Sequence, residues 1–203
     1  MSRRFGLVLA IAIALVTAMS ASAQSPADVV LADLDEFWAE QFAAAGHAYW
    51  PPGVVLLGEP VATSCGTLSS SFGPGAYCGA DSTLYYTPVW FFSFESDGFD
   101  HALLTVLAHE WGHHLQLLIG IPWSAAKGYE LQADCLAGVY ARHAEQQGLA
   151  PVGALAESIR LSAISGDVGP LPHDAAEHGT GAERAISFFN GYEAGVIGCG
   201  ITL

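Results

Sequence analysis

The hexapeptide HEWGHH, residues 109–114, places three histidines and a glutamate inside a stretch that is otherwise apolar. On a helix, His109 and His113 project from one face a turn apart, so their imidazoles can share one metal ion. This spacing suits zinc, with Glu110 placed to act as a general base on a water molecule. His114 lies about 100° around the helix from His113 and is expected to face away from the metal. The sequence therefore predicts a metal site built on His109 and His113.

A second pair of acidic residues supplies a candidate for the missing ligand. Seventeen residues beyond His113, the segment YELQADC carries Glu130 and Asp134 on one face of a further helix. A catalytic zinc takes three protein ligands and keeps one open position, and two histidines with one glutamate are a common set. Glu130 is the predicted third ligand, and Asp134 is expected to accept the N–H of a ligating histidine. An alternative, in which Asp134 is the ligand and Glu130 lies outside the site, stays open.

The rest of the zinc helix bears on the same site. In the longer pattern H-E-x-x-H-x-x-G-x-x-H, the third histidine ligand follows closely after the first two. That pattern would need glycine at position 116 and histidine at 119, whereas the chain has Gln116 and Ile119. Glu110 and its neighbouring histidines lie in an apolar run without a nearby lysine or arginine, so each needs a partner or a metal to offset its burial. Gly112 is predicted to let another element approach closely. The alternatives are a chance motif on an ordinary helix and a solvated face for the second acidic pair.

Hydrophobic periodicity and capping residues predict the elements that must position these side chains. Helices are predicted over residues 25–46, 101–120, 125–148, 151–165 and 181–195, and strands over 53–59 and 82–92. The segment 63–79 is expected to be a loop. A helix, a few strands and then a run of helices indicate an α+β fold. We expect one mainly helical domain over residues 24–203, with a small edge β-sheet and a zinc site between two helices.

The second predicted strand precedes the zinc helix and contains Leu84, Tyr85 and Tyr86. Proline cannot donate to a strand ladder, so Pro88 favours an edge strand. A free edge at this strand could pair with an extended peptide substrate. An ordinary core sheet explains the same residues equally well, because tyrosine and tryptophan are common in strands.

The first 23 residues have the composition of an export signal. MSRR is basic, the fifteen residues FGLVLAIAIALVTAM are apolar, and Ala21 to Ala23 match the small-residue pattern of a signal peptidase site. We expect cleavage before Gln24 and a secreted or periplasmic protein. An uncleaved membrane anchor is the alternative, but spanning a bilayer usually takes about 20 apolar residues.

The charge of the chain limits its partners. The chain holds 6 Lys+Arg against 20 Asp+Glu, a formal net charge of −14. Because an acidic surface repels phosphate groups, neither nucleic acid nor a membrane surface is expected as a partner. After Gln24 no apolar run is long enough to cross a membrane.

Four cysteines suit two disulfides in an exported chain: Cys65, Cys78, Cys135 and Cys199. Three connectivities are possible, and we favour the sequential one. Cys65 with Cys78 closes a short Gly/Ser-rich loop, and Cys135 with Cys199 ties a helix to the C-terminal tail. A cysteine zinc site would need closely spaced pairs such as C-x₂-C, which this sequence lacks.

Several ordered motifs of this chain resemble one known family, the bacterial neutral zinc metallopeptidases. The resemblance rests on AHEWGHHLQ, ELQADCLAG and HGTGAERAISFFNGYEAG followed by Cys199, together with the upstream CG…GPGAYCGADSTLYY, and it covers most of the chain from about Cys65 onward. It implies a zincin-like domain of the gluzincin arrangement with Glu110 as the catalytic residue. The zinc ligands that it implies are His109, His113 and Glu130. Trp111 departs from the pattern, since the family usually has a small aliphatic residue there, so the packing behind the ligands is expected to differ.

The predicted chemistry is hydrolysis of peptide or protein substrates with one Zn²⁺ ion per chain. Glu110 would take a proton from the attacking water and return it to the leaving amine. A second donor for the developing oxyanion is expected among four side chains, Tyr129, Tyr140, His178 and Tyr192. Of these we favour His178, in the HGTG segment.

The alternative function is a non-catalytic extracytoplasmic zinc-binding or interaction domain. A purely structural zinc site needs no general base and usually closes its fourth position with a protein ligand, so the presence of Glu110 favours the enzyme. The remaining histidines have no sequence partner at metal spacing: His47, His101, His143 and His173.

Overall fold

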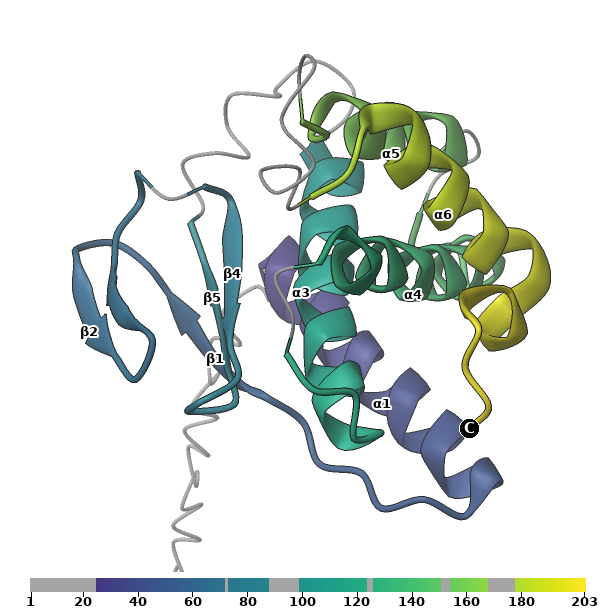
Figure 1. The fold of residues 1–203 in the computed structure, drawn as a ribbon, viewed down its shortest axis with the longest axis horizontal. Coiled ribbons are helices and arrows are strands. Elements are labelled where there is room, and N and C mark those ends of the chain that lie inside the picture. Colours follow the sequence, from purple (N-terminus) through teal and green to yellow (C-terminus); the bar gives the residue numbers. More distant parts are fainter. Residues whose placement is uncertain (1–24, 72, 88–98, 124–125, 151–153, 168–177) are drawn as a thin grey trace, which may run out of the picture.

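The computed structural model describes residues 25–71, 73–87, 99–123, 126–150, 154–167 and 178–203. The helices are α1 (Pro26–Ala45), α3 (Phe99–Leu118), α4 (Lys127–Gln146), α5 (Ala154–Ile164), α6 (Gly181–Ala194) and the short 3-10 helix η1 (Gly195–Cys199). The strands are β1 (Gly53–Leu56), β2 (Val61–Thr63), β3 (Gly66–Leu68), β4 (Gly75–Cys78) and β5 (Thr83–Tyr86). Figure 1 shows the strands on one side and the helices on the other, so the predicted α+β class is confirmed. The expected export segment, Pro88 and His173 lie outside the described residues.

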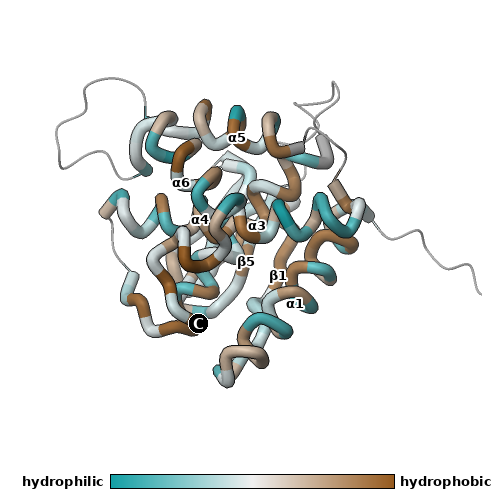
Figure 2. Tube along the Cα trace, turned by 90° about the vertical axis from the view of Figure 1, so that its right-hand side faces the viewer, coloured by the Kyte–Doolittle hydropathy of each residue, from teal (hydrophilic) through white to brown (hydrophobic). Residues whose placement is uncertain are grey.

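Helix α1 shows how local residues set a helix and its buried face. Ser25 and Asp28 form a capping box, in which the Asp28 N–H donates to the Ser25 hydroxyl at 3.2 Å and the Ser25 N–H donates to the Asp28 carboxylate at 3.0 Å. The buried residues recur every three or four positions: Ala27, Val30, Leu34, Trp38 and Phe42. Figure 2 shows this alternation of hydrophilic and hydrophobic residues along α1, whose apolar side joins the core with α3. Neither α1 nor any other described helix is long and apolar enough to cross a bilayer.

Helices α3 and α4 cross closely, and the crossing brings the candidate ligands together. A Cβ atom added to Gly112 would lie 3.0 Å from the carbonyl oxygen of Ala133, so glycine permits the close approach that its place in the motif suggested. Glu130 and Asp134 stand near Ala133 in α4 and both contact His109 of α3. Trp111 is buried on the core side of α3, in the same apolar cluster as the residues of α1.

Helix α6 packs directly on α4. At Gly191 an added Cβ would lie 1.8 Å from the carbonyl oxygen of Cys135, so only glycine fits there. A disulfide between Cys135 and Cys199 also ties α4 to the end of η1. This packing matters for the site because α6 carries Arg184, which reaches α4 and α3.

The three-stranded sheet has the order β1-β5-β4. β5 runs parallel to β1 and antiparallel to β4, so Leu84 is paired on both sides. The prediction that the strand of Leu84, Tyr85 and Tyr86 presents a free edge is therefore wrong. The inference from Pro88 fails because β5 ends at Tyr86, before the proline. In the described part of the sheet, the free edge next to α3 belongs to β4.

The segment 63–79 was expected to be a loop but holds β3 and β4. β2 and β3 form an antiparallel hairpin, and β4 joins the sheet. A disulfide between Cys65 and Cys78 closes this segment, so both disulfides of the structure follow the sequential pairing favoured from the sequence. These short strands were not predicted because the segment is rich in glycine and serine, which are more typical of turns.

Candidate metal centre

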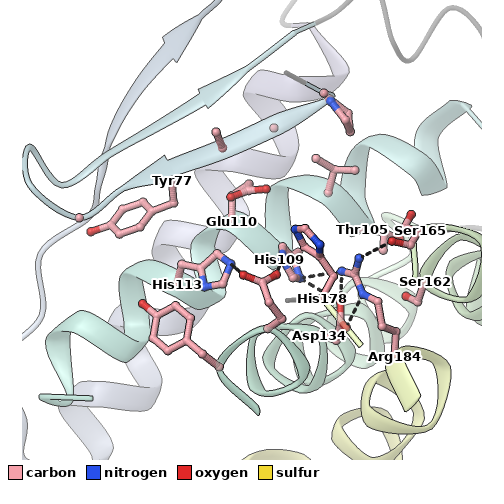
Figure 3. Close-up of a pocket in the computed structure, with 18 of the residues that line it drawn as sticks. Tyr77, Thr105, His109, Glu110, His113, Asp134, Ser162, Ser165, His178 and Arg184 are labelled. Carbon is pink, nitrogen blue, oxygen red and sulfur yellow. Dashed lines mark hydrogen bonds and ion pairs between the residues drawn. The ribbon is translucent and has the colours of Figure 1, made fainter. Parts of the chain in front are cut away.

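The side chains of His109, His113 and Glu130 converge between α3 and α4, with their candidate ligand atoms all within 4.8 Å of one another. Nε2 of His109 lies 3.2 Å from one carboxylate oxygen of Glu130, and Nε2 of His113 lies 3.5 Å from the other. Two ligands of a tetrahedral zinc, each about 2.0–2.1 Å from the ion, stand about 3.3 Å apart. These three side chains therefore lie close enough together to hold one metal ion. Figure 3 shows the two histidines side by side on α3 with Glu110 next to them.

Asp134 holds His109 from the side opposite Glu130. The Nδ1–H of His109 donates to Oδ1 of Asp134 at 2.9 Å, which leaves Nε2 free to bind a metal. Arg184 donates two hydrogen bonds to the same carboxylate, at 2.7 and 2.8 Å, drawn as dashed lines in Figure 3. Because both oxygens of Asp134 are engaged in this way, the geometry favours Glu130 as the third ligand.

Arg184 is the site residue that sequence reasoning missed. We expected no lysine or arginine near the apolar zinc helix, but Arg184 comes from 50 residues beyond Asp134. The sequence did carry a signal for Arg184, because it lies at helical spacing from Phe188 and Gly191 on the buried face of α6. A charged side chain on a buried face needs a partner. Burial acts to raise the pKa of Asp134, but Arg184 and His109 outweigh it and hold that pKa below its usual value.

Gln116 does for His113 what Asp134 does for His109. Its side-chain oxygen accepts the Nδ1–H of His113 at 2.9 Å, and its amide group donates to the carbonyl oxygen of Tyr129 at 2.8 Å. The Tyr129 ring also stacks on His113, with ring centroids 5.0 Å apart. Gln116 is completely buried, and these hydrogen bonds satisfy its polar atoms inside the apolar helix packing. Both histidines thus have a set orientation, with Nε2 directed at the Glu130 carboxylate.

The carboxylates of Glu130 and Asp134 both contact His109 and affect its protonation. Burial acts to lower the pKa of His109, but Asp134 and Glu130 outweigh it and raise that pKa to about 10. For Glu130, burial acts to raise the pKa, but contacts with His109 and His113 hold it well below its usual range. A metal ion that binds here therefore has to displace a proton from His109.

Glu110 lies beside the ligands and beneath β4. Its side chain is buried, and burial raises the pKa of its carboxyl, while the charges of His109 and His113 act in the opposite direction. A Cβ added to Gly75 would lie 2.9 Å from Cγ of Glu110, so this glycine lets β4 pack directly on the glutamate. A buried carboxyl with a raised pKa beside a metal site suits proton transfer.

His114 uses both of its ring nitrogens away from the candidate ligands. Its Nε2–H donates to the carbonyl oxygen of Trp50 at 2.7 Å, and its Nδ1 accepts the hydroxyl proton of Tyr77 at 2.9 Å. The ring is completely buried, and burial lowers its pKa, so His114 is neutral. It connects α3 to β4 and to the segment before β1.

Two of the four oxyanion candidates lie in the cavity. Tyr129 and His178 belong to its wall. The hydroxyls of Tyr140 and Tyr192 form hydrogen bonds elsewhere. Asp167 holds His178, because it accepts the backbone N–H of His178 at 3.1 Å and lies 3.4 Å from the ring Nδ1. Among the described residues, none forms a hydrogen bond with the other ring nitrogen, Nε2.

The cavity is open and has a volume of about 830 Å³. Its wall combines residues of β4, α3, α4, α5 and α6, with the candidate ligands and Glu110 among them. In the described part of the chain, no second group of histidine, cysteine, aspartate and glutamate has metal spacing. Of the other histidines, His143 pairs with Asp33 at 3.3 Å, and His101 is buried outside the cavity.

The chain matches one family model over residues 12–201, under the description "Putative neutral zinc metallopeptidase". Similar relatives are "Uncharacterized protein YpfJ" of Escherichia coli (strain K12) and "Uncharacterized protein Rv2575" of Mycobacterium tuberculosis (strain H37Rv), each 33% identical, over 193 and 178 residues. The alignments cover 82% and 72% of this chain, and 67% and 60% of the relatives. No solved structure matches it. Since the family match spans nearly its whole length, the chain belongs to the family described as "Putative neutral zinc metallopeptidase".

Proposed function

We propose that this protein is an exported zinc-dependent peptidase that hydrolyses peptide bonds. The observation that carries the proposal is the convergence of His109, His113 and Glu130 beside the buried Glu110. The donor set fits zinc, because each histidine has its Nδ1 engaged and its Nε2 near the Glu130 carboxylate. A bound Zn²⁺ would polarise the scissile carbonyl group and acidify the attacking water.

Glu110 accepts a proton from the attacking water and delivers it to the leaving amine. Its raised pKa lets the carboxyl hold that proton between the two transfers. His178, positioned by Asp167, donates a hydrogen bond to the carbonyl oxygen as negative charge develops on it. Asp134 keeps its hydrogen bond to His109 throughout, so that Nε2 stays directed at the ion.

An extended peptide binds along the free edge of β4. Residues Gly75 to Tyr77 of this strand line the cavity, and Gly75 packs against Glu110. Main-chain hydrogen bonds to such an edge would hold a peptide across the catalytic carboxyl regardless of its sequence. This assigns to β4 the role that the sequence suggested for the strand of Leu84 to Tyr86.

We also propose that the protein is exported as a single domain that comprises residues 24–203. Both disulfides, Cys65–Cys78 and Cys135–Cys199, would persist in an oxidising compartment, which supports a secreted or periplasmic location. Measuring the mass of the protein recovered outside the cytoplasm tests cleavage before Gln24. A mass that includes the first 23 residues would contradict it.

The function is tested by zinc content and peptide hydrolysis in the wild type and in Glu110→Gln. The variant is expected to keep one zinc per chain and to lose about 10²- to 10⁴-fold in kcat. Glu130→Ala should weaken zinc binding, whereas the exposed control Glu59→Gln should change neither property. Zinc binding without hydrolysis of any peptide in a library would favour a non-catalytic domain, and hydrolysis that survives Glu110→Gln would refute the mechanism.

A further inference from the structure

The cavity has two chemically different ends along α3. Val106 and Leu117 both line it, and eleven residues of helix separate them by about 16 Å at 1.5 Å per residue. Figure 3 shows Glu110 between Tyr77 and His113 on one side and Thr105, Ser162 and Arg184 on the other. The second side is therefore rich in hydroxyl groups and charge. The first side continues past His113 towards the end of α3.

The end beyond His113 is formed by large apolar side chains that face solvent. Leu117 is 41% exposed and Trp123 is 78% exposed, although both line the cavity. The N–H of Ile121 donates to the carbonyl oxygen of Gln116 at 2.9 Å, which folds the segment after α3 back on its last turn. The side chain of Ile121 thereby joins the same wall.

These side chains contribute nothing to the core of the described residues. Leu115 and Leu118 pack into the main hydrophobic cluster, whereas Leu117, Ile121 and Trp123 lie outside it. Leaving such residues exposed in a cavity costs solvation free energy, and an exposed apolar patch rimmed by polar groups commonly marks a binding site. A ligand is therefore the occupant that they fit.

The aromatic residues of this end are uncharged. Tyr77 and Tyr129 stand on the cavity wall, and the ring of Tyr129 stacks on His113. The charged groups of the wall belong to the metal site or to the opposite end, as Arg184 does. Among the described residues of this end, a charged substrate side chain would find no partner, while an apolar one would be desolvated on several sides.

We propose that Leu117, Ile121 and Trp123, with Tyr77 and Tyr129, form the specificity subsite of this enzyme for a bulky apolar or aromatic side chain of the substrate. The inference rests on the proposed peptidase function and adds the substrate class. Leu117 lies one helical turn, about 6 Å, beyond His113, and an extended peptide advances about 3.3 Å per residue. The selected side chain is therefore within about two residues of the scissile bond.

The test uses the zinc-loaded full chain and a library of fluorogenic peptides. Cleavage sites should be enriched in phenylalanine, tyrosine, tryptophan, leucine or methionine at one position within two residues of the cut. Trp123→Ala and Leu117→Ala should each lower the ratio of kcat/KM for phenylalanine over serine at that position, by about 10-fold. Leu56→Ala is the control, because Leu56 is also an exposed leucine but lies on β1 outside the cavity. Trp123 is mostly exposed, so its removal should leave folding intact.

A binding measurement separates this inference from the peptidase proposal. Zinc-loaded Glu110→Gln is titrated with an alanine–glycine peptide series in which one phenylalanine or one serine is moved through every position. At one position the phenylalanine peptide should bind about 10-fold more tightly, and Trp123→Ala should abolish the difference.

The outcomes point to different proposals. Cleavage without an apolar preference, or with a preference unchanged in both variants, would overturn the subsite and leave the peptidase. Preferential binding that depends on Trp123, without cleavage of any library peptide by the wild type, would support the subsite and overturn the peptidase. If there is neither cleavage nor preferential binding, both proposals fail.

Discussion

Replacing Arg184 by methionine is expected to loosen the zinc site without touching a ligand. Arg184 donates hydrogen bonds of 2.7 and 2.8 Å to Asp134, a residue that is only 2% exposed. Removing one partner of a buried ion pair typically costs about 3–5 kcal/mol, because the remaining charge stays buried, and Asp134 would keep only its hydrogen bond to His109. For a chain of this size that corresponds to a fall in Tm of roughly 6–20 °C. Zinc binding should weaken by about 10- to 100-fold, since Asp134 would hold His109 less firmly.

The matched control is Arg160→Met. Arg160 pairs with Glu157 three residues away, but more than half of its side chain is exposed, and such surface pairs contribute about 0–1 kcal/mol. Tm of the zinc-free proteins is measured by thermal unfolding in a chelator, and the zinc dissociation constant by competition with a coloured chelator. Adding Asp134→Asn to Arg184→Met should recover part of the stability but not the zinc affinity. The reasoning is refuted if Arg184→Met and Arg160→Met have the same Tm and zinc affinity.

Three further results are expected, for zinc binding, for stability against pH and for catalysis. Zinc binding at pH 7.5 should release about one proton, because His109 has its pKa raised to about 10. Titration calorimetry in buffers of different ionisation enthalpy measures the number of protons released. Zero release would contradict a protonated His109 in the zinc-free protein. Since that pKa is raised, its contribution to the stability of the zinc-free protein is complete below about pH 6.5 and is lost as pH rises towards 10. Gly75→Ala should lower kcat by about 10- to 100-fold with unchanged zinc affinity, because the new Cβ would lie 2.9 Å from Cγ of Glu110 and displace it. Gly58→Ala has no atom within 4 Å of the new Cβ and should match the wild type; equal kcat in both variants would show that Glu110 does not need this packing.

The helices were the most predictable part of the fold. α1 follows its capping box and its three-and-four spacing of apolar residues, and α3 and α4 follow long apolar or amphipathic runs that end shortly before Gly120 and Gly148. These signals are local, because the residues that make them contact one another within a turn or two of chain. The strands were less predictable: β4 lies in a glycine-rich segment, and its place at the sheet edge depends on its pairing with β5.

The local spacing of residues by itself determined the candidate chemistry of this chain. His109 and His113 must share a face on any helix, Glu110 must stand beside them, and Glu130 with Asp134 repeats the same spacing on the next helix. From this alone, a metal site between two helices could be predicted, and the three candidate ligands do converge.

Only the tertiary structure decided what surrounds these residues. It brought Glu130 within metal spacing of His109 and His113, and it paired the Asp134 carboxylate with Arg184 from α6. It also gave the free strand edge to β4 and placed Trp123 on the cavity wall. The physical reason is that helix spacing acts over a few residues, whereas these contacts join residues tens of positions apart. Such contacts depend on how closely the helices pack at glycines such as Gly112, which no periodicity along the chain records.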